Sequence, residues 1–126
     1  RGDGLGIGRL VKAGFPFLIL SKEQNPVVSR RAEKLRVDIA QGIDNKAEVL
    51  SEWITANGLD PARVAYVGND INDLEAFSVV GWPIAVADAH PQVLAAARTI
   101  LTRRGGLGAV REVCDLIDPE KTRSAA

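Results

Sequence analysis

Two carboxylates and two carboxamides crowd into five residues near the middle of the chain: Asn69, Asp70, Asn72 and Asp73. They follow the apolar run 64–67, which predicts a buried strand, and they precede an apolar pattern of helical spacing. Ligands of open α/β sheets bind at the carboxyl ends of the strands, and oxygen-bearing side chains suit a hard cation such as Mg²⁺. The sequence therefore predicts a Mg²⁺ site on this loop.

A simpler reading of the same loop is that Asn69 or Asp70 only caps the next helix, since Asn and Asp are favoured at that position. A cap needs one such residue, whereas the loop carries four. The number of oxygen-bearing side chains favours the metal site, and the capping role stays open beside it.

Ser21 and Lys46 are the other two polar residues that follow predicted strands, residues 15–20 and 37–40. A hydroxyl, an ammonium and a metal-binding loop at one sheet edge are what phosphoryl transfer requires, because charge develops on the phosphoryl oxygens. Ser21 alone could be an ordinary loop hydroxyl. Lys46 begins a predicted helix, where a cation opposes the helix dipole, so we expect it to hold an anion.

The rest of the chain alternates between helical and strand patterns. Helices are predicted before Gly14, after the cap Asn25, over an amphipathic stretch closed by Asn57 and Gly58, after His90, and over 109–117. Further strands are predicted over 82–87 and 99–102. Such alternation predicts a doubly wound parallel α/β sheet, and residues 118–126 are expected to form a flexible C-terminal tail.

The composition is that of one ordinary globular domain: 126 residues, 46% apolar and 25% charged, with Lys plus Arg balancing Asp plus Glu at 16 each. A net charge of zero disfavours nucleic-acid and membrane partners, and no apolar run is long enough for a membrane span. The single Cys114 predicts a core thiol in a reducing, cytoplasmic setting. Because methionine is absent, we expect this chain to be part of a longer protein.

Several motifs resemble the haloacid dehalogenase superfamily: residues 20–21, Lys46, and the run 68–73 match its second, third and fourth motifs. The wider frame resembles 3-deoxy-D-manno-octulosonate 8-phosphate phosphatases and the phosphatase-like domain of some acylneuraminate cytidylyltransferases. The segments that carry this resemblance are 3–7, 41–46, 65–68, 86–91 and 105–117. Residues 1–117 would then be one N-terminally truncated phosphatase domain.

The resemblance implies a Mg²⁺-dependent phosphatase that acts on a sugar-acid phosphate through an aspartyl-phosphate. Ser21 would bind the phosphoryl oxygens, and Lys46 would steady the nucleophile and the phosphate. Within the loop 69–73, Asn69, Asp70 and Asp73 would hold the metal. It further implies a compact capless homotetramer in which the region 105–112 helps to close a neighbour's site. Substrate contacts would come from Asn25, Gly42, Gly105 and Gly106.

Two departures from the family pattern affect these expectations. The central strand that carries the nucleophilic aspartate has no counterpart in residues 1–126, so we expect the nucleophile upstream, and the chain alone to be inactive and poorly stable. Asn69 also stands where the superfamily usually has a metal-binding aspartate. The alternative function is a non-catalytic oligomerisation module of an acylneuraminate cytidylyltransferase, for which weaker metal binding would matter less.

Overall fold

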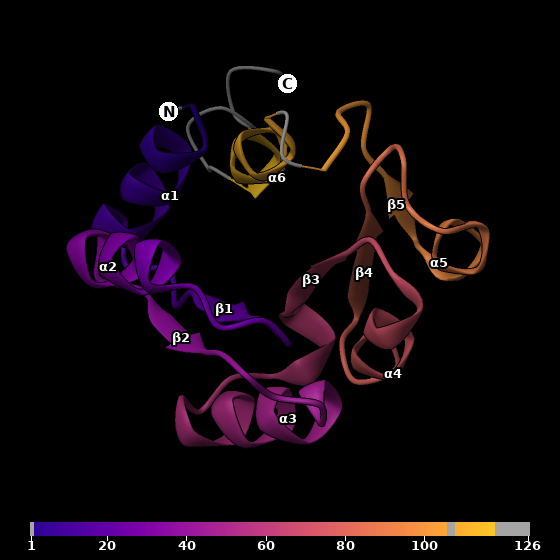
Figure 1. Ribbon diagram of the computed structural model, residues 1–126, viewed down its shortest axis with the longest axis horizontal. Helices are drawn as coiled ribbons and strands as arrows, with labels where there is room; N and C mark the ends of the chain where they lie inside the picture. The colour runs from indigo at the N-terminus through magenta and orange to yellow at the C-terminus, as the bar shows by residue number, and fades with distance from the viewer. Residues whose placement is uncertain (1, 106–107, 118–126) are drawn as a thin grey trace.

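The structure is a computed structural model that describes residues 2–105 and 108–117. Figure 1 shows the course of the chain. The strands are β1 (Leu18–Leu20), β2 (Asp38–Ala40), β3 (Ala65–Gly68), β4 (Trp82–Ala85) and β5 (Thr99–Ile100). The α-helices are α1 (Gly2–Lys12), α2 (Pro26–Leu35), α3 (Lys46–Ala56), α4 (Leu74–Phe77), α5 (Pro91–Ala96) and α6 (Ala109–Ile117), with 3₁₀ turns η1 (Pro61–Arg63) and η2 (Ile71–Asp73).

The ends of three helices follow from single residues, as predicted. Helix α1 stops just before Gly14, which has a φ of 93° that suits glycine. The Asn25 side chain accepts a hydrogen bond of 2.9 Å from the backbone N–H of Val27 and caps α2. Helix α3 ends at Asn57, followed by Gly58 with a φ of 64°. Local sequence therefore sets the helix boundaries that place the sheet.

The described strands form two parallel sheets, one of order β1-β2 and the other of order β3-β4-β5. The first pairs Leu18 with Asp38, and the second pairs Gly68 with Ala85. The strands are shorter than predicted: β1 begins at Leu18 rather than at residue 15. Pro16 explains part of this difference, because proline has no N–H to donate to a ladder.

Strands β1 and β3 each pair on one side only, since among the described strands β1 pairs with β2 and β3 with β4. The two face each other across the centre of the molecule in Figure 1. Residues 18–20 and 65–67 are partly exposed, so the apolar run 64–67 is less buried than predicted. The parallel pairing of all five described strands agrees with the parallel α/β architecture that the sequence predicted.

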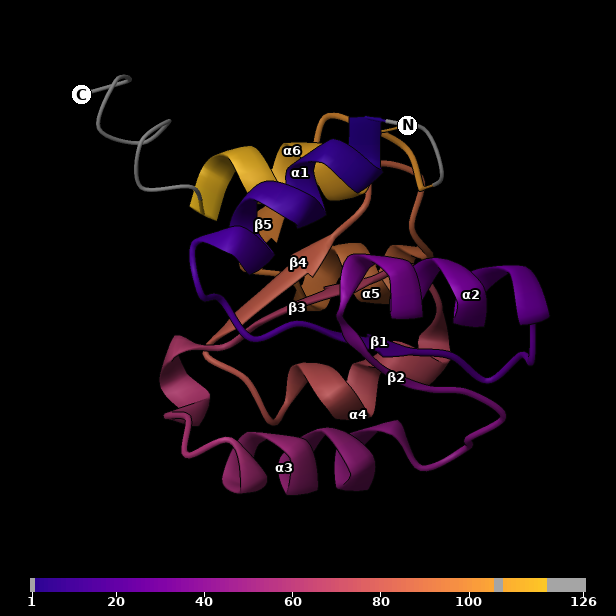
Figure 2. The same cartoon turned by 90° about the vertical axis from the view of Figure 1, so that its left-hand side faces the viewer.

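Helices lie on both faces of the two sheets, with α1 and α6 on one side and α3 and α4 on the other (Figures 1 and 2). Helix α1 crosses α6 closely at Gly6, where an added Cβ would lie 2.9 Å from the Cβ of Cys114. Cys114 is buried, as predicted. On the opposite side, Leu50 and Ile54 of α3 pack with α4, and Leu18 and Tyr66 from both sheets contact this cluster. Helix packing thus bridges the two sheets.

No helix within residues 2–105 and 108–117 has the length and apolar character of a membrane span.

Candidate active site

The acidic loop begins at the carboxyl end of β3, where Gly68 lets the chain fold back on itself. Gly68 is buried, and an added Cβ would lie 2.8 Å from the Cβ of Asp73. Asp70 caps η2, because its side chain accepts a hydrogen bond of 2.7 Å from the backbone N–H of Ile71. Asp70 therefore has the capping role that the sequence left open. The side chains of Asn69 and Asp70 are both exposed.

Asp73 is buried and anchors this loop. It is the one buried charged residue in the described part of the chain, at 3% exposure. Its carboxylate accepts hydrogen bonds from the Tyr66 hydroxyl (2.5 Å), from Lys46 Nζ (3.0 Å) and from the backbone N–H groups of Asn69 (2.9 Å) and Asp70 (3.2 Å). Four protein donors thus surround the two oxygens, and the loop is held in one conformation.

These contacts lower the pKa of Asp73 and raise the pKa of Tyr66. Burial acts to raise the pKa of Asp73, but the hydrogen bonds from Tyr66, the loop backbone and Lys46 outweigh it and hold the pKa below its ordinary value. Burial, followed by the hydrogen bond to Asp73 and its negative charge, raises the pKa of Tyr66 far above its ordinary value. Tyr66 is therefore a neutral donor to a charged carboxylate at physiological pH.

Lys46 is the first residue of α3, the position where its charge opposes the helix dipole. Within the chain its charge is paired with Asp73: Lys46 Nζ lies 3.0 Å from Asp73 Oδ1, and the Lys46 side chain is 11% exposed. Lys46 also donates to Asn72 Oδ1 at 3.5 Å. Since an ammonium has three N–H donors, one of them stays available for a further acceptor.

Ser21 lies on the neighbouring β1–β2 side, directly after β1. Its N–H donates to Ala40 O (3.0 Å), and its carbonyl accepts from the N–H of Ile43 (3.3 Å), three residues before Lys46. Its Oγ accepts from the backbone N–H of Glu23 (3.1 Å), which leaves its O–H free to donate. The structure thereby ties Ser21 to the segment that leads into α3.

Asn25 and Gly42 belong to the same group of loops. The carbonyl of Asn25 accepts from Gln41 Nε2 at 3.3 Å, while its side chain caps α2. Gly42 has a φ of 67°, and an added Cβ would lie 2.7 Å from Gln24 Nε2. Both residues therefore have structural roles, in the loops that follow β1 and β2.

The remaining predicted residues lie beyond β4 and β5. The N–H of Gly105 donates to Asp88 Oδ1 at 2.9 Å, and Gly106 lies outside the described residues. His90 caps α5 through Nδ1, and its own N–H donates to the carbonyl of Asn69 at 3.0 Å. The loop after β4 is therefore fastened to the acidic loop, and the side chain of His90 serves as the N-cap of α5.

Glu112 of α6 holds the segment that follows β5. Its carboxylate accepts from the N–H and hydroxyl of Thr102 and from the N–H of Arg103, at 2.9 to 3.1 Å. Desolvation acts to raise the pKa of Glu112, but these hydrogen bonds and the Arg103 charge outweigh it and lower the pKa. The conformation of the 102–105 segment thus depends on α6.

Tyr66 is the site residue that sequence reasoning missed. Its hydroxyl stands in an otherwise apolar strand four residues before the first acid of the loop. A polar group at an inward-facing strand position must find a partner, and that requirement is the signal that could have pointed to Asp73.

Asn69 and Asp70 are the predicted metal ligands whose side chains are exposed at this edge. Within residues 2–105 and 108–117 no group of three or more His, Cys, Asp or Glu side chains could hold a metal ion. Asn69 and Asp70 nevertheless expose an amide oxygen and a carboxylate beside each other at the sheet edge. Because Mg²⁺ binds through one or two carboxylates and keeps several waters, these two side chains fit Mg²⁺, whereas the contacts of Asp73 engage it elsewhere.

Comparison with known proteins places this geometry in a family. The model of haloacid dehalogenase-like hydrolases matches residues 19–110. A 3-deoxy-D-manno-octulosonate 8-phosphate phosphatase from Yersinia pestis is 37% identical over 116 residues, which are 91% of this chain and 62% of that protein. The chain thus spans about three fifths of the length of the curated relatives it matches.

Solved structures agree in fold. A haloacid dehalogenase family hydrolase from Streptomyces avermitilis shares 52% identity with a TM-score of 0.89, over 96% of this chain and 75% of that one. The 3-deoxy-D-manno-octulosonate 8-phosphate phosphatase from Moraxella catarrhalis, solved with a magnesium ion, a phosphate ion and the sugar acid, shares 38% identity with a TM-score of 0.88, over 92% and 67%. The chain belongs to the haloacid dehalogenase-like hydrolases.

Proposed function

We propose that this chain is the larger part of a Mg²⁺-dependent phosphomonoester hydrolase that acts on a sugar-acid phosphate such as 3-deoxy-D-manno-octulosonate 8-phosphate. The observation that carries the proposal is the Lys46–Asp73 ion pair, which lies at the carboxyl edge of β3 beside the exposed oxygens of Asn69 and Asp70. The relatives named for this reaction support the choice of substrate. We also propose that the protein is a homotetramer, as the resemblance implies, and that it is cytoplasmic, as the single Cys114 favours.

In the proposed reaction, an aspartate carboxylate attacks phosphorus, the bond to the sugar oxygen breaks, and water later hydrolyses the aspartyl-phosphate. Lys46 would direct its remaining N–H towards the phosphoryl oxygens while Asp73 fixes its ammonium. Ser21 would donate its O–H to another of these oxygens. Asn69 and Asp70 would hold Mg²⁺, which neutralises phosphoryl charge when bound.

We propose that the aspartate comes from a further strand between β1 and β3. Each of these strands has one edge without a partner among the described strands, and backbone N–H and C=O groups at such edges need partners. A parallel strand placed there would end at the same carboxyl edge as β1 and β3 and would carry its side chains between Ser21 and the acidic loop.

The direct test is phosphate release from 3-deoxy-D-manno-octulosonate 8-phosphate by the full-length protein, with and without Mg²⁺. We expect Mg²⁺-dependent release that falls by at least about 100-fold in Ser21→Ala, because that variant removes a transition-state donor without disturbing a buried charge. Ser29→Ala is the matched control, since Ser29 lies one loop away and bonds Gln41. A folded protein that releases no phosphate from any sugar-acid phosphate would favour the oligomerisation module instead.

Asn69 allows a sharper test of the metal role. Asn69→Asp adds a negative charge at the exposed end of the loop, so the Mg²⁺ concentration needed for half-maximal activity should fall several-fold. Asn57→Asp adds the same charge at the far end of α3 and serves as the control. Equal Mg²⁺ dependence in both variants would remove Asn69 from the metal site.

A further inference from the structure

The carboxylate of Asp73 serves two parts of the site through different oxygens. Its Oδ1 accepts hydrogen bonds from the Tyr66 hydroxyl (2.5 Å) and from Lys46 Nζ (3.0 Å). Its Oδ2 accepts from the backbone N–H groups of Asn69 (2.9 Å) and Asp70 (3.2 Å). One oxygen therefore holds the lysine, and the other holds the loop that carries the proposed metal ligands.

The hydroxyl of Tyr66 is presented to Asp73 by a ring that the core holds in place. The ring meets Phe77 edge-on, with centroids 6.0 Å apart and an angle of 82° between the planes, and Phe77 is buried. Tyr66 and Gly68 lie on the same face of β3, because side chains alternate along a strand. An added Cβ at Gly68 would lie 2.8 Å from the Cβ of Asp73 and 3.0 Å from Cε1 of Phe77. The two rings and the carboxylate thus pack together on one face of β3, and the hydroxyl has a fixed position.

Lys46 has no comparable means of fixing its own ammonium. The group stands at the end of a flexible four-carbon stem, and its contact with Asn72 Oδ1 is long, at 3.5 Å. The terminal torsion of an aspartate is soft, so the loop amides that hold Oδ2 leave the position of Oδ1 to a second contact. The Tyr66 hydroxyl makes the shorter of the two hydrogen bonds to Oδ1. The place of the Lys46 ammonium therefore depends on Tyr66, through Asp73.

We propose that Tyr66 is a positioning residue of the phosphatase reaction: its hydroxyl fixes Asp73 Oδ1 and thereby holds the Lys46 ammonium where its remaining N–H meets the phosphoryl oxygens. The inference rests on the proposed function, because it takes the phosphoryl group as the ligand of Lys46. Charge on the phosphoryl oxygens develops in the transition state. A displaced Lys46 therefore slows the chemical step rather than weakening substrate binding.

The variant Tyr66→Phe, made in the full-length protein, removes the hydroxyl and keeps the ring. With 3-deoxy-D-manno-octulosonate 8-phosphate as substrate, we expect kcat to fall about 10- to 100-fold, as for a displaced group at a reacting centre. KM and the Mg²⁺ concentration for half-maximal activity should both stay within about twofold of the wild type, because Oδ2 still holds the loop amides. An unchanged kcat would overturn the proposal. A Mg²⁺ requirement that rises in step with the loss of kcat would overturn it too, because Tyr66 would then only stabilise the metal loop.

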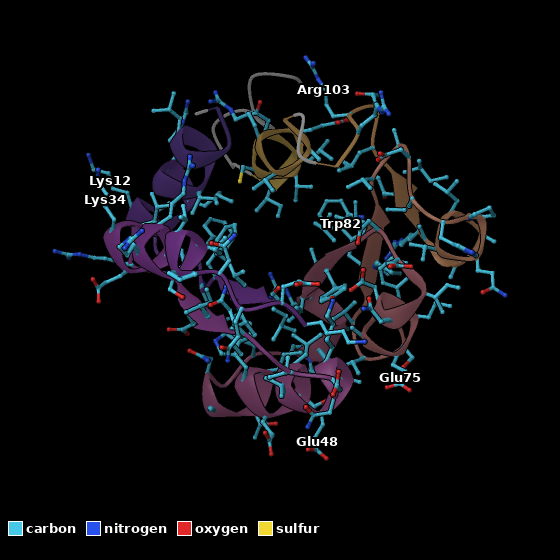
Figure 3. All side chains as sticks on the ribbon, viewed as in Figure 1. Lys12, Lys34, Glu48, Glu75, Trp82 and Arg103 are labelled. Atoms are coloured by element: carbon cyan, nitrogen blue, oxygen red, sulfur yellow. The ribbon has the colours of Figure 1, made fainter. Side chains whose placement is uncertain are left out.

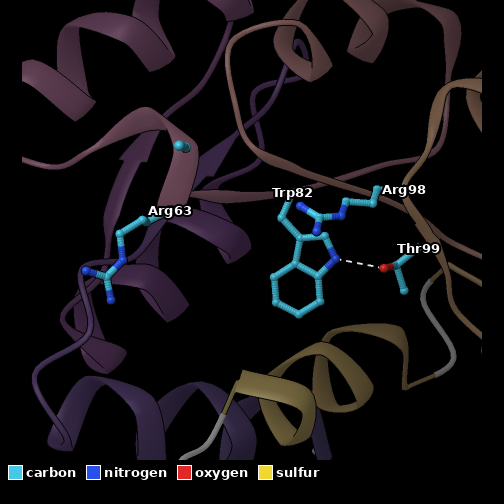
Figure 4. A pocket seen from close by; sticks show the side chains of 5 residues that line it. Arg63, Trp82, Arg98 and Thr99 are labelled. Atoms are coloured by element: carbon cyan, nitrogen blue, oxygen red, sulfur yellow. Dashed lines mark hydrogen bonds between the residues drawn. The ribbon is translucent and has the colours of Figure 1, made fainter.

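The matched control is Trp82→Phe. Like Tyr66, Trp82 is a half-buried aromatic residue of the same sheet with one polar donor, and its Nε1–H donates to Thr99 Oγ1 at 2.8 Å (Figure 4). Figure 3 shows Trp82 well apart from Glu48, which lies with Lys46 in the first turn of α3. Since the distant Asp73 keeps its donors, kcat in this variant should stay within about twofold of the wild type. Equal losses of kcat in the two variants would overturn the proposal, because both would then act by loosening the sheet.

A measurement that needs no turnover separates this inference from the proposed function. Mild reductive methylation, followed by mass spectrometry, modifies a lysine at a rate that depends on how freely its amine is exposed. The side chain of Lys46 is 11% exposed and that of Lys22 is 63% exposed, so Lys22 is an internal reference. The ratio of Lys46 to Lys22 modification should rise several-fold in Tyr66→Phe and stay unchanged in Trp82→Phe.

This ratio keeps its meaning whatever the activity of the wild type. If the wild type releases no phosphate from any sugar-acid phosphate, the proposed function fails. A higher ratio in Tyr66→Phe would still support the hold of Tyr66 on the ammonium of Lys46, and an unchanged ratio would overturn it.

Discussion

Replacing Lys46 by methionine removes the ammonium from the ion pair with Asp73 but keeps most of the side-chain length. The two side chains are 11% and 4% exposed, and removing one partner of a buried pair costs about 3–5 kcal/mol because the other charge is left unpaired. Asp73 keeps its donors from Tyr66 and the loop backbone. We therefore expect a loss near the lower end, about 3 kcal/mol, in the free energy of unfolding.

A matched control exists in the same chain. Lys22 and Asp44 form an ion pair of 3.9 Å whose side chains are 63% and 87% exposed, so Lys22→Met should cost at most about 1 kcal/mol. Urea denaturation of the full-length protein, read as a shift in midpoint at constant slope, measures both values.

The double variant Lys46→Met with Asp73→Asn completes a cycle that isolates the coupling between the two charges. It should lose much less than the sum of the single variants, because each single variant leaves a group without its partner. The ion pair does not hold the loop as inferred if Lys46→Met costs no more than Lys22→Met. The same follows if the losses in Lys46→Met and Asp73→Asn simply add up to the loss in the double variant.

Three further outcomes follow from the packing and the shifted pKa values. Gly81→Ala should lower the free energy of unfolding by at least about 2 kcal/mol, because its Cβ would strike the carbonyl of Ala62. Gly8→Ala is the control, since Gly8 has open space around it; in thermal melts it should be neutral or stabilising. The pKa of Tyr66 is raised, so an absorbance titration compared with Tyr66→Phe should show no ionisation of Tyr66 near pH 10 before unfolding. The pKa of Glu112 is lowered, so its ionised carboxylate stabilises the fold at neutral pH and this stabilisation is lost in acid. Glu112→Gln should therefore reduce the difference in the free energy of unfolding between pH 7 and pH 3. An unchanged difference would contradict this.

Much of the architecture could be predicted from local signals. The cap Asn25 followed by proline sets the start of α2, and Gly14 sets the end of α1, because each acts on its own backbone. The carboxyl-edge location of Lys46 and the acidic loop follows from strand order in a parallel sheet.

Contacts that depend on the path of the chain in space could not be predicted in this way. The inward turn of Asp73 requires the close reversal at Gly68 and the hydroxyl of Tyr66, and residue spacing alone shows neither.

The division between the two sheets has a consequence for the behaviour of this segment in solution. Residues 18–20 and 65–68, the outer strands at the division, contain no charge and no proline, and edge strands of that kind readily pair with strands of other molecules. We expect the isolated 126-residue segment to self-associate as its concentration rises, and a peptide that pairs with both strands to suppress this. The unpaired backbone groups of β1 and β3 would then be the cause of aggregation.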